Sequence, residues 1–421
     1  MQRLIGFLKN VVTWLNNNKL ASAYILSSPY LIIKAFSRGE FNTYIGAAEQ
    51  LRLGNSCYHV WLHYQGIGNS QYGYSPLFAT LLIPFSYSPV WVPALLFLLA
   101  DVWMLFHIFK LLLNWLDIYD DSVQKKVVLL TIVFSLRMIL HNFEMVQMNI
   151  LLLWVTLQGL QYLFFENKIS RGAFLLALGI NFKILPLVFI PYLIFRKQLT
   201  AVLITLIFTG ITFLLPAFVW GYSFNFQLHQ EWLSVINPFL DKYNTGQNVE
   251  SYRIHGLAAL FSAYFSKAES GSFQLLLYPL NSEMLSLLTN AVRLLLIVLT
   301  LFFLRQRPFN PQNSSKHFFI EVSYLLLITP LIFPQQNKWA FVYSIPAYLV
   351  IFYAFLSKSW KEYPVIMLSL IIVFALTTLT TDGIIGKRLN YYTESLKLVT
   401  IGTILIIPIL MYSKFRLFDN D

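Results

Sequence analysis

The sequence predicts an all-α protein that crosses a membrane several times. Hydrophobic residues make up 57% of the 421 residues and charged residues only 12%, whereas an ordinary soluble domain has roughly 25% charged residues. The apolar residues also come in blocks of about 18 to 22, the length of a helix that crosses a bilayer. This composition provides too little polar surface for a soluble protein of this length. It also excludes disorder, which requires low hydrophobicity.

We expect a single integral membrane domain over residues 1–421, a bundle of about 10 to 12 spans that includes short broken helices. Residues 1–19 form a short interfacial amphipathic helix in this interpretation. The first outer loop, 37–74, and the large outer loop, 221–283, are too polar to cross, and connections this long usually carry function. The expected apolar segments are 20–36, 75–90, 91–112, 127–143, 149–165, 172–195, 200–220, 284–304, 318–333, 339–356, 363–380 and 395–413.

The basic residues predict the orientation of the bundle. With both termini in the cytoplasm, the short inside loops and tails hold 17 of the 30 Lys and Arg residues, as the positive-inside rule requires. The net charge of +11 is scattered over these loops and forms no stripe, so we exclude nucleic acid as a partner. The 17 residues are Arg3, Lys9, Lys19, Lys110, Lys125, Lys126, Lys168, Arg171, Arg196, Lys197, Arg305, Arg307, Lys316, Lys358, Lys361, Lys414 and Arg416.

This orientation requires helices that break inside the membrane. Both ends of 172–195 lie inside, so the segment is expected as two half-helices that meet near Pro186, with Lys183 at the tip. Segment 75–112 starts outside and ends inside, so 75–90 is expected to be a half-helix or re-entrant. Broken helices at membrane depth line a cavity or pack against protein, which favours a functional site over a plain bundle.

Several polar residues lie near the outer ends of the expected spans. Glu40 follows the first span, and 42–53 is expected to be a helix that lies on the membrane. A carboxylate at the mouth of a cavity can act as a general base, although an ordinary solvated acid has the same sequence signal. Tyr44 belongs to the helical pattern of 42–53, and Tyr74 fits either a site or an interfacial aromatic belt. His141 and Glu144 have a metal-compatible spacing, but two ligands are too few for a metal site.

Further polar residues are expensive to bury in a bilayer and therefore usually face a cavity or a partner helix. Gln147 and Asn149 form one such pair, for which interhelical hydrogen bonds are the simpler interpretation. Lys183 lies in an apolar stretch, where it can meet a lipid phosphate, pair with an acid such as Asp101, or reach the interface. The remaining candidates precede the apolar segment 256–265 or form the turn between two late spans: Arg253, His255, Gln335 and Lys338.

Other classes of protein lack support. The chain has no P-loop, GxSxG or HExxH motif, and its only cysteine, Cys57, cannot form an internal disulfide or a cysteine zinc site. The inner loops are too short for a nucleotide-binding domain, and we see no inverted repeat typical of secondary carriers. No cofactor and no metal-ligand set is indicated.

Taken in order, these elements resemble glycosyltransferase family 87, the polyprenol-phosphate-mannose-dependent mannosyltransferase-like membrane enzymes of GT-C architecture. The family's first outer loop reads D-F-x-x-Y-x-x-A-A-x-x-x-x-x-G, and residues 40–54 read EFNTYIGAAEQLRLG. The family's Y-x-P-P, G-Q-x-N and R-G…A-G…G…K-x-x-P elements appear here as Tyr74-Ser75-Pro76, Val146-Gln147-Met148-Asn149, and Arg171-Gly172, Gly179, Lys183 and Pro186. Two departures matter: Glu40 replaces an aspartate, and the turn 333–339 has no histidine, so that residue's role is lost or has moved to Lys338.

The resemblance implies a hexosyltransferase of the cell membrane, with mannose as the family's best-known sugar. Its donor is an outward-facing polyprenyl-phosphate sugar, and its acceptor is a lipid or glycan hydroxyl. Glu40 acts as the base in an inverting reaction, and Lys183 or Lys338 neutralises the phosphate. Substrate-binding roles fall on Tyr44, Tyr74, Gln147, Asn149, Arg253, His255 and Gln335. The alternatives are a transporter or flippase of lipid-linked sugars, and a scaffold in an envelope complex.

Overall fold

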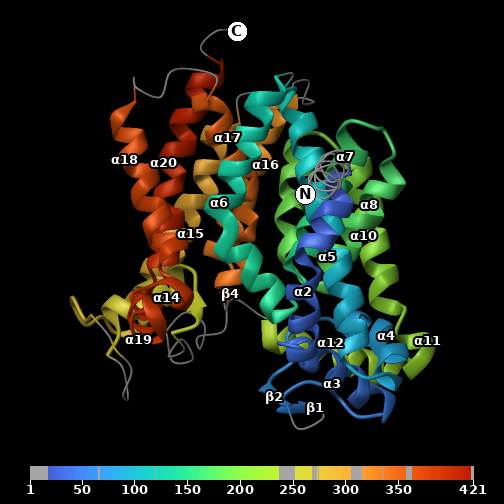
Figure 1. Cartoon of the computed structure of the whole chain (residues 1–421). Helices are drawn as coiled ribbons and strands as arrows, with labels where there is room; N and C mark the ends of the chain where they lie inside the picture. The colour runs from blue at the N-terminus through green and yellow to red at the C-terminus, as the bar shows by residue number, and fades with distance from the viewer. Residues whose placement is uncertain are drawn as a thin grey trace, which may run out of the picture. The chain divides into compact units, whose positions relative to one another are not determined.

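The structure, a computed structural model, is helical over most of the residues it describes (Figure 1). These residues are 18–64, 67–118, 120–236, 252–267, 273, 275–304, 315–334, 336–356 and 363–418. Within them, six helices are long and apolar enough to cross a membrane, and further apolar helices have 10–17 residues. The predicted class, an all-α polytopic membrane protein, is confirmed. The interfacial helix predicted for 1–19 lies almost wholly outside the described residues.

The chain divides into two compact units, which we describe separately. Unit 1 contains residues 1–110, 142–154 and 213–235, and unit 2 contains residues 111–141, 155–212 and 236–421. Helices α5 (Trp91–Leu116), α6 (Asp121–Met145), α7 (Asn149–Phe164), α10 (Leu199–Leu214) and α12 (Tyr222–Ile236) each contribute residues to both units. The single integral domain remains a prediction.

Unit 1 is built around a short helix that the sequence places on the membrane surface. Helix α3, Phe41–Arg52, is buried along most of its length and packs against α4, η1 and β1. The predicted helix is therefore confirmed, but it forms a core rather than a surface, because the small residues Gly46, Ala47 and Ala48 allow close packing. The other elements of unit 1 are α2 Lys19–Ser37, β1 Leu62–Tyr64, β2 Ile67–Ser70, α4 Pro76–Leu82, η1 Ile83–Tyr87, most of α5 Trp91–Leu116, α11 Ala217–Trp220 and most of α12 Tyr222–Ile236.

Segment 75–90 forms two short pieces, α4 and η1, which together are too short to cross a bilayer. Helix α4 begins where Ser75 accepts a hydrogen bond from the Phe78 N–H at 3.2 Å, and Pro76 occupies the first helical turn, where no N–H is needed. The predicted half-helix is therefore present. The hairpin β1–β2, with Leu62 opposite Ser70, has no counterpart in our reading of the sequence.

In unit 2, α16, α17, α18 and α20 pack together, with α19 and α14 near one end of α18 (Figure 1). Helices α16 and α17 are largely covered by other parts of the chain. On α16, Glu321 is fully buried, and it accepts hydrogen bonds from Arg196 Nε at 3.1 Å and from the Tyr192 hydroxyl at 2.7 Å. A buried carboxylate requires such pairing.

The elements that lie wholly or partly in unit 2 run along the chain in the order of the expected spans. They include α6 Asp121–Met145, α7 Asn149–Phe164, α8 Ile169–Phe182, η2 Leu185–Val188, α9 Phe189–Phe195, α10 Leu199–Leu214, β3 Ile254–His255, α14 Leu257–Phe265, α15 Ser282–Phe303, α16 Ser315–Ile332, β4 Gln336–Asn337, η3 Lys338–Ser344, α17 Ile345–Leu356, α18 Pro364–Phe374, the π-helical turn η5 Ala375–Leu379, α19 Asp382–Ser395 and α20 Leu398–Phe418.

Two breaks shape this unit. Segment 172–195 is interrupted as predicted, because α8 ends at Phe182, Lys183 is extended, and η2 begins just before Pro186. The second break has no sequence prediction. Segment 364–379 and α19 meet at an angle of 88°, so the chain turns sharply and brings the end of α19 back beside α20.

Close helix contact in unit 2 depends on a pair of glycines. A Cβ at position 172 would lie 2.6 Å from the carbonyl oxygen of Gly159, well inside van der Waals contact. A Cβ added at position 210, on α10, would meet no neighbouring atom of the described residues within 4 Å.

We predict that Gly172→Ala lowers the stability of the protein by about 1–3 kcal/mol, the usual cost of overpacking a well-packed contact. The matched Gly210→Ala variant should be neutral or stabilising, because alanine favours a helix over glycine. Thermal unfolding of both variants in detergent measures the difference. Equal midpoints for the two variants would contradict the close packing at Gly172.

Candidate functional site

The candidate base, Glu40, lies at a backbone junction in unit 1. Its N–H donates a hydrogen bond to the carbonyl of Met145 at 3.0 Å. The preceding Gly39 has φ +48°, and a Cβ at that position would lie 2.6 Å from the Met145 backbone. Because other residues cannot occupy this position without strain, Gly39 is what allows Glu40 to lie beside the end of α6.

A hydrogen-bonded network surrounds the Glu40 side chain, and we call its four members, Glu40, Tyr44, Tyr74 and Gln147, the carboxylate cluster. The Gln147 amide donates to Glu40 Oε2 at 2.6 Å. Its carbonyl oxygen lies 3.2 Å from the hydroxyl of Tyr44 and 3.2 Å from that of Tyr74, and the two hydroxyls are 3.0 Å apart. The structure thus brings four predicted site residues together.

The electrostatics of the carboxylate cluster place its charge on Glu40. Burial raises the pKa of Tyr44 well above its ordinary value, and Tyr74 and Glu40 raise it further. Burial and the Glu40 charge likewise raise the pKa of Tyr74. Both phenols therefore remain neutral hydrogen-bond donors at physiological pH, and Gln147 is fully buried between them and the carboxylate.

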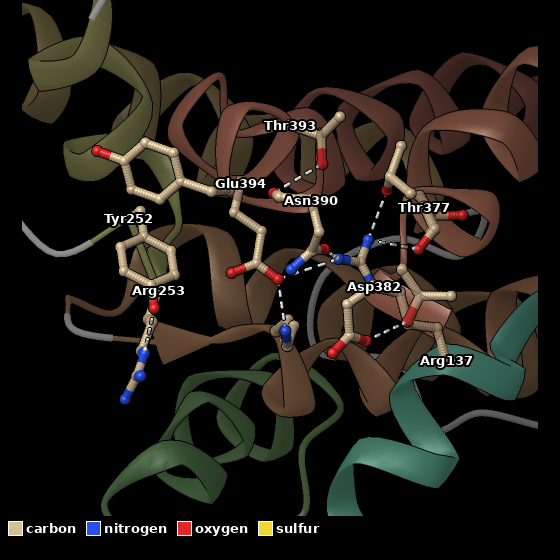
Figure 2. Close-up of polar contacts among 12 residues, drawn as sticks. Arg137, Tyr252, Arg253, Thr377, Asp382, Asn390, Thr393 and Glu394 are labelled. Atoms are coloured by element: carbon tan, nitrogen blue, oxygen red, sulfur yellow. Dashed lines mark hydrogen bonds and ion pairs between the residues drawn. The ribbon is translucent and has the colours of Figure 1, made fainter. Parts of the chain in front are cut away.

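A second polar group lies in unit 2, where α19 carries Glu394 back toward α6 (Figure 2). Glu394 Oε1 is 3.1 Å from Arg137 Nη2 and also forms an ion pair with Lys338. Arg137 donates further hydrogen bonds to Thr380 Oγ1 at 2.6 Å, Asn390 Oδ1 at 3.1 Å and the Thr377 carbonyl at 3.3 Å. The arginine is thus held by the π-helical turn on one side and by α19 on the other.

His255 and Lys397 complete this group, and we call Arg137, His255, Lys338, Glu394 and Lys397 the cation cluster. His255 is 1% exposed on β3, and neither of its ring nitrogens has a hydrogen-bond partner among the described residues. Burial lowers the pKa of His255 well below its ordinary value, and the nearby charges of Lys397, Arg137 and Lys338 lower it further. The imidazole is therefore neutral.

Local backbone geometry explains the position of His255. Strand β3 pairs with β4, so His255 lies directly opposite Gln336. This is the turn in which the sequence lacks the histidine of the resembled family. The next residue, Gly256, has φ +107°, and a Cβ there would lie 3.1 Å from the Pro330 carbonyl. Its N–H donates to Thr400 Oγ1 at 3.2 Å, which fixes the strand against α20.

Lys397 lies between α19 and α20 in a left-handed backbone conformation, with φ +56°. Its ammonium group donates to the Tyr252 carbonyl at 3.3 Å. Burial lowers the pKa of Lys397 to about 8, against an opposing effect of Glu394. Lys397 therefore carries a charge at neutral pH that is easily lost in mild alkali.

Other predicted site residues fall outside these two clusters. Asn149 is fully buried and donates to Asn142 at 3.4 Å, as an interhelical contact would. Lys183 lies at the C-terminal end of α8, and the hydrogen bonds and ion pairs described for the cation cluster do not include it. Arg253 is exposed and points away from Glu394 (Figure 2). Gln335 lies outside the described residues.

Two alternatives from the sequence can also be settled in part. Glu144 forms an ion pair with Lys34 at 2.8 Å, and His141 packs against the Trp339 ring at 5.1 Å. Asp101 is fully buried on α5, and its carboxyl oxygens have no hydrogen-bond partner among the described residues. The interpretation of Asp101 as the partner of Lys183 therefore gains no support.

Sequence reasoning missed three members of the cation cluster. Arg137 lies within the predicted span 127–143, where an arginine is as unusual as the lysine that was noticed at position 183. That signal was present in the sequence. Glu394 and Lys397 stand at the start of the last span and look like ordinary interfacial charges until the bend before α19 is known.

The fold and these clusters define a polytopic membrane protein with buried polar groups suited to chemistry on a polar substrate. The family model of glycosyltransferase family 87 matches residues 72–334. This is more than half of the chain, so the chain belongs to that family and is a membrane glycosyltransferase, which confirms the resemblance. No curated protein and no solved structure matches the chain. The family match includes Tyr74, Arg137, Gln147 and His255, whereas Glu40 precedes it.

We predict that the stability of the folded protein depends on pH because of Lys397. Its pKa is about 8 in the folded protein, against an ordinary value of 10.5, so between these values the unfolded chain binds more protons than the folded one. The contribution of Lys397 to the free energy of unfolding therefore rises as the pH increases from about 8 to 10.5, and it is lost as the pH falls through about 8.

The Lys397→Met variant lacks this contribution. The unfolding midpoint of the wild type, measured in detergent from neutral pH to above pH 10, should therefore rise relative to that of the variant as the pH increases. Lys387→Met, which removes an exposed lysine of α19, is the matched control. A constant difference between wild type and Lys397→Met would contradict the burial of this ammonium group.

Proposed function

We propose that this protein transfers a hexose from a polyprenyl-phosphate sugar to an acceptor hydroxyl at the outer face of the cell membrane, with inversion at the anomeric carbon. Mannose is the first sugar to test. The observation that carries the donor class is the cation cluster, because a buried excess of cationic side chains in a membrane protein suits a lipid-borne phosphate. The acceptor is a lipid or a glycan, and no nucleotide is required.

In the proposed reaction, Glu40 removes the proton of the acceptor hydroxyl while the oxygen attacks the anomeric carbon. The bond between that carbon and the phosphate oxygen breaks, and the polyprenyl phosphate leaves with the electron pair. The negative charge of the phosphate group increases by one as it leaves. Cations that bind this group therefore stabilise the transition state more than they stabilise the bound donor. A phosphate leaving group needs no proton, which is why a single carboxylate suffices.

The carboxylate cluster supports the role of Glu40. The Gln147 amide fixes one carboxylate oxygen at 2.6 Å, and the neutral hydroxyls of Tyr44 and Tyr74 hold that amide in turn. A base that is oriented by such a network loses little entropy when it reacts. Of the two lysines that the sequence favours for the phosphate, Lys338 is the better candidate, because it belongs to the cation cluster.

The first test replaces Glu40. We expect Glu40→Gln to lower the rate of transfer from a labelled polyprenyl-phosphate sugar by about 10²–10⁴-fold, the usual contribution of a general base. Glu40→Asp should keep part of the activity, because it retains the carboxylate. Glu49→Gln is the matched control, since Glu49 lies on α3, which Glu40 precedes, and its partly exposed side chain forms an ion pair with Arg52 at 3.4 Å. Full activity of Glu40→Gln would remove Glu40 from the base role.

The same assay separates transfer from transport. In proteoliposomes, a flippase would move the labelled lipid between leaflets without transferring its sugar, and Glu40→Gln would leave that movement unchanged. We expect sugar transfer instead, with donors that carry mannose, glucose or galactose compared side by side. Movement of the lipid without any transfer to acceptors would favour the transporter alternative.

A second variant tests the network that orients Glu40. Gln147→Leu removes a hydrogen bond to a charged group, which is worth about 1.5–3 kcal/mol, so we expect kcat to fall about 10- to 100-fold with little change in KM. Gln161→Leu is the matched control, because Gln161 accepts a hydrogen bond from Trp115 at 2.6 Å, apart from the carboxylate cluster. Equal kinetics for both variants would show that Gln147 does not orient the base.

A further inference from the structure

The cation cluster contains a buried group with unused hydrogen-bonding capacity. His255 is 1% exposed, and both ring nitrogens are without a partner among the described residues. Buried polar groups are almost always hydrogen-bonded, so each exception requires an explanation. A neutral imidazole has one N–H donor and one acceptor nitrogen, and an anionic oxygen is a partner that the N–H can take.

The charges of the cluster lead to the same conclusion. Arg137, Lys338 and Lys397 are three largely buried cations, and Glu394 is the buried carboxylate among them. Asp382, which also acts on Arg137, lies at the exposed edge. Buried charges are normally compensated. Among the described residues, the cluster thus holds more positive than negative buried charge, beside an imidazole with no hydrogen-bond partner there, which fits an anion of charge between one and two.

We propose that the phosphate group of a polyprenyl-phosphate ligand binds in this cluster, that His255 donates a hydrogen bond to it, and that Glu394 is an internal counter-ion which the phosphate displaces from Lys338. This inference rests on the proposed function and adds residues that it did not assign. Without a ligand, Glu394 supplies the negative charge that the phosphate supplies when it is bound, and it keeps the three cations together.

The geometry indicates which cation moves. Arg137 is fixed by Thr377, Thr380 and Asn390 in addition to Glu394, and its side chain is only 4% exposed. Lys338 pairs with Glu394, and its side chain is 18% exposed. A lysine is also a flexible point charge, whereas a multiply bonded arginine is preorganised. Lys338 therefore turns to the incoming phosphate while Arg137 retains Glu394.

Glu394 also sets the affinity for the product. The donor is a phosphodiester with one negative charge, and the released polyprenyl phosphate is a monoester with up to two. With Glu394 ionised, the three cations have a net charge that matches the monoester. Without Glu394, the positive charge would exceed that of the product and hold it more tightly. The carboxylate is thus a positioning residue that favours product release.

The test measures the binding of farnesyl phosphate to the purified full-length protein in nanodiscs, with inorganic phosphate and mannose 1-phosphate as separate ligands. We expect farnesyl phosphate to bind better than either soluble phosphate, which identifies the lipid as the source of the group. Glu394→Gln should lower the Kd of farnesyl phosphate about tenfold, and His255→Phe should raise it about tenfold, the size of one charge-assisted hydrogen bond. Glu394→Asp should restore the wild-type Kd.

Matched controls separate this role from general damage to the fold. Glu321→Gln removes another buried carboxylate that pairs with an arginine, and His107→Phe removes a hydrogen-bonded histidine of α5; neither should change the Kd. A second measurement needs no Glu394 variant. Nitrogen-15 spectra of labelled histidines should show the His255 signal, assigned by its loss in His255→Phe, shift when farnesyl phosphate is added.

Two outcomes would overturn the inference: an unchanged or higher Kd in a folded Glu394→Gln protein, or a His255 signal that farnesyl phosphate does not move. Absence of any binding by the wild type would overturn it as well. The proposed function fails in a different way. If the variants follow the expected order of Kd but the wild type transfers no sugar, the phosphate site stands and the transferase mechanism does not.

Discussion

The pairing of Arg137 with Glu394 is the constraint on which much of unit 2 depends. A guanidinium group on a helix within an apolar bundle is stable only with a carboxylate and further acceptors around it. The chain supplies them by turning through 88° after α18, so that α19 carries Asn390 and Glu394 to the arginine. The same turn brings Lys397 to the start of α20, and the pairing of β3 with β4 adds His255. The Arg137–Glu394 ion pair thus depends on this bend of the chain and lies within a buried cluster of charged side chains.

In unit 1 a charged side chain is likewise held by hydrogen-bond partners, but these partners carry no charge. Here the carboxylate of Glu40 accepts a hydrogen bond from the neutral Gln147 amide, and its position depends on the backbone contact of Gly39 and Glu40 with Met145. The Gln147 amide orients the carboxylate, and the neutral phenols of Tyr44 and Tyr74 orient that amide without adding charge. The cation cluster instead gathers charges that attract an anion. The two clusters thus differ in kind: one holds a carboxylate among neutral groups, and the other holds several cations around one carboxylate.

The sequence allowed most of the fold to be predicted, because span length and hydrophobicity are strong local signals. Glu40, Tyr44, Tyr74 and Gln147 were also predicted as site residues, since motif order in the family places them. The core position of α3 was not predicted, because amphipathic spacing does not distinguish a membrane surface from a protein core. Glu394 and Lys397 were missed for a similar reason. Their role depends on the bend before α19, and an 88° change of direction has no reliable signature in composition.

The π-helical turn Ala375–Leu379 has a consequence for how this fold can vary. Such a turn contains one more residue than the α-helical turn it replaces. Loss of one residue there would restore a regular helix and rotate everything beyond it by about 100°. The Thr377 carbonyl and Thr380 would then leave Arg137, and α19 would present a different face to the arginine. In this region the number of residues is as strict a requirement as their identity, so insertions and deletions should be less tolerated than substitutions.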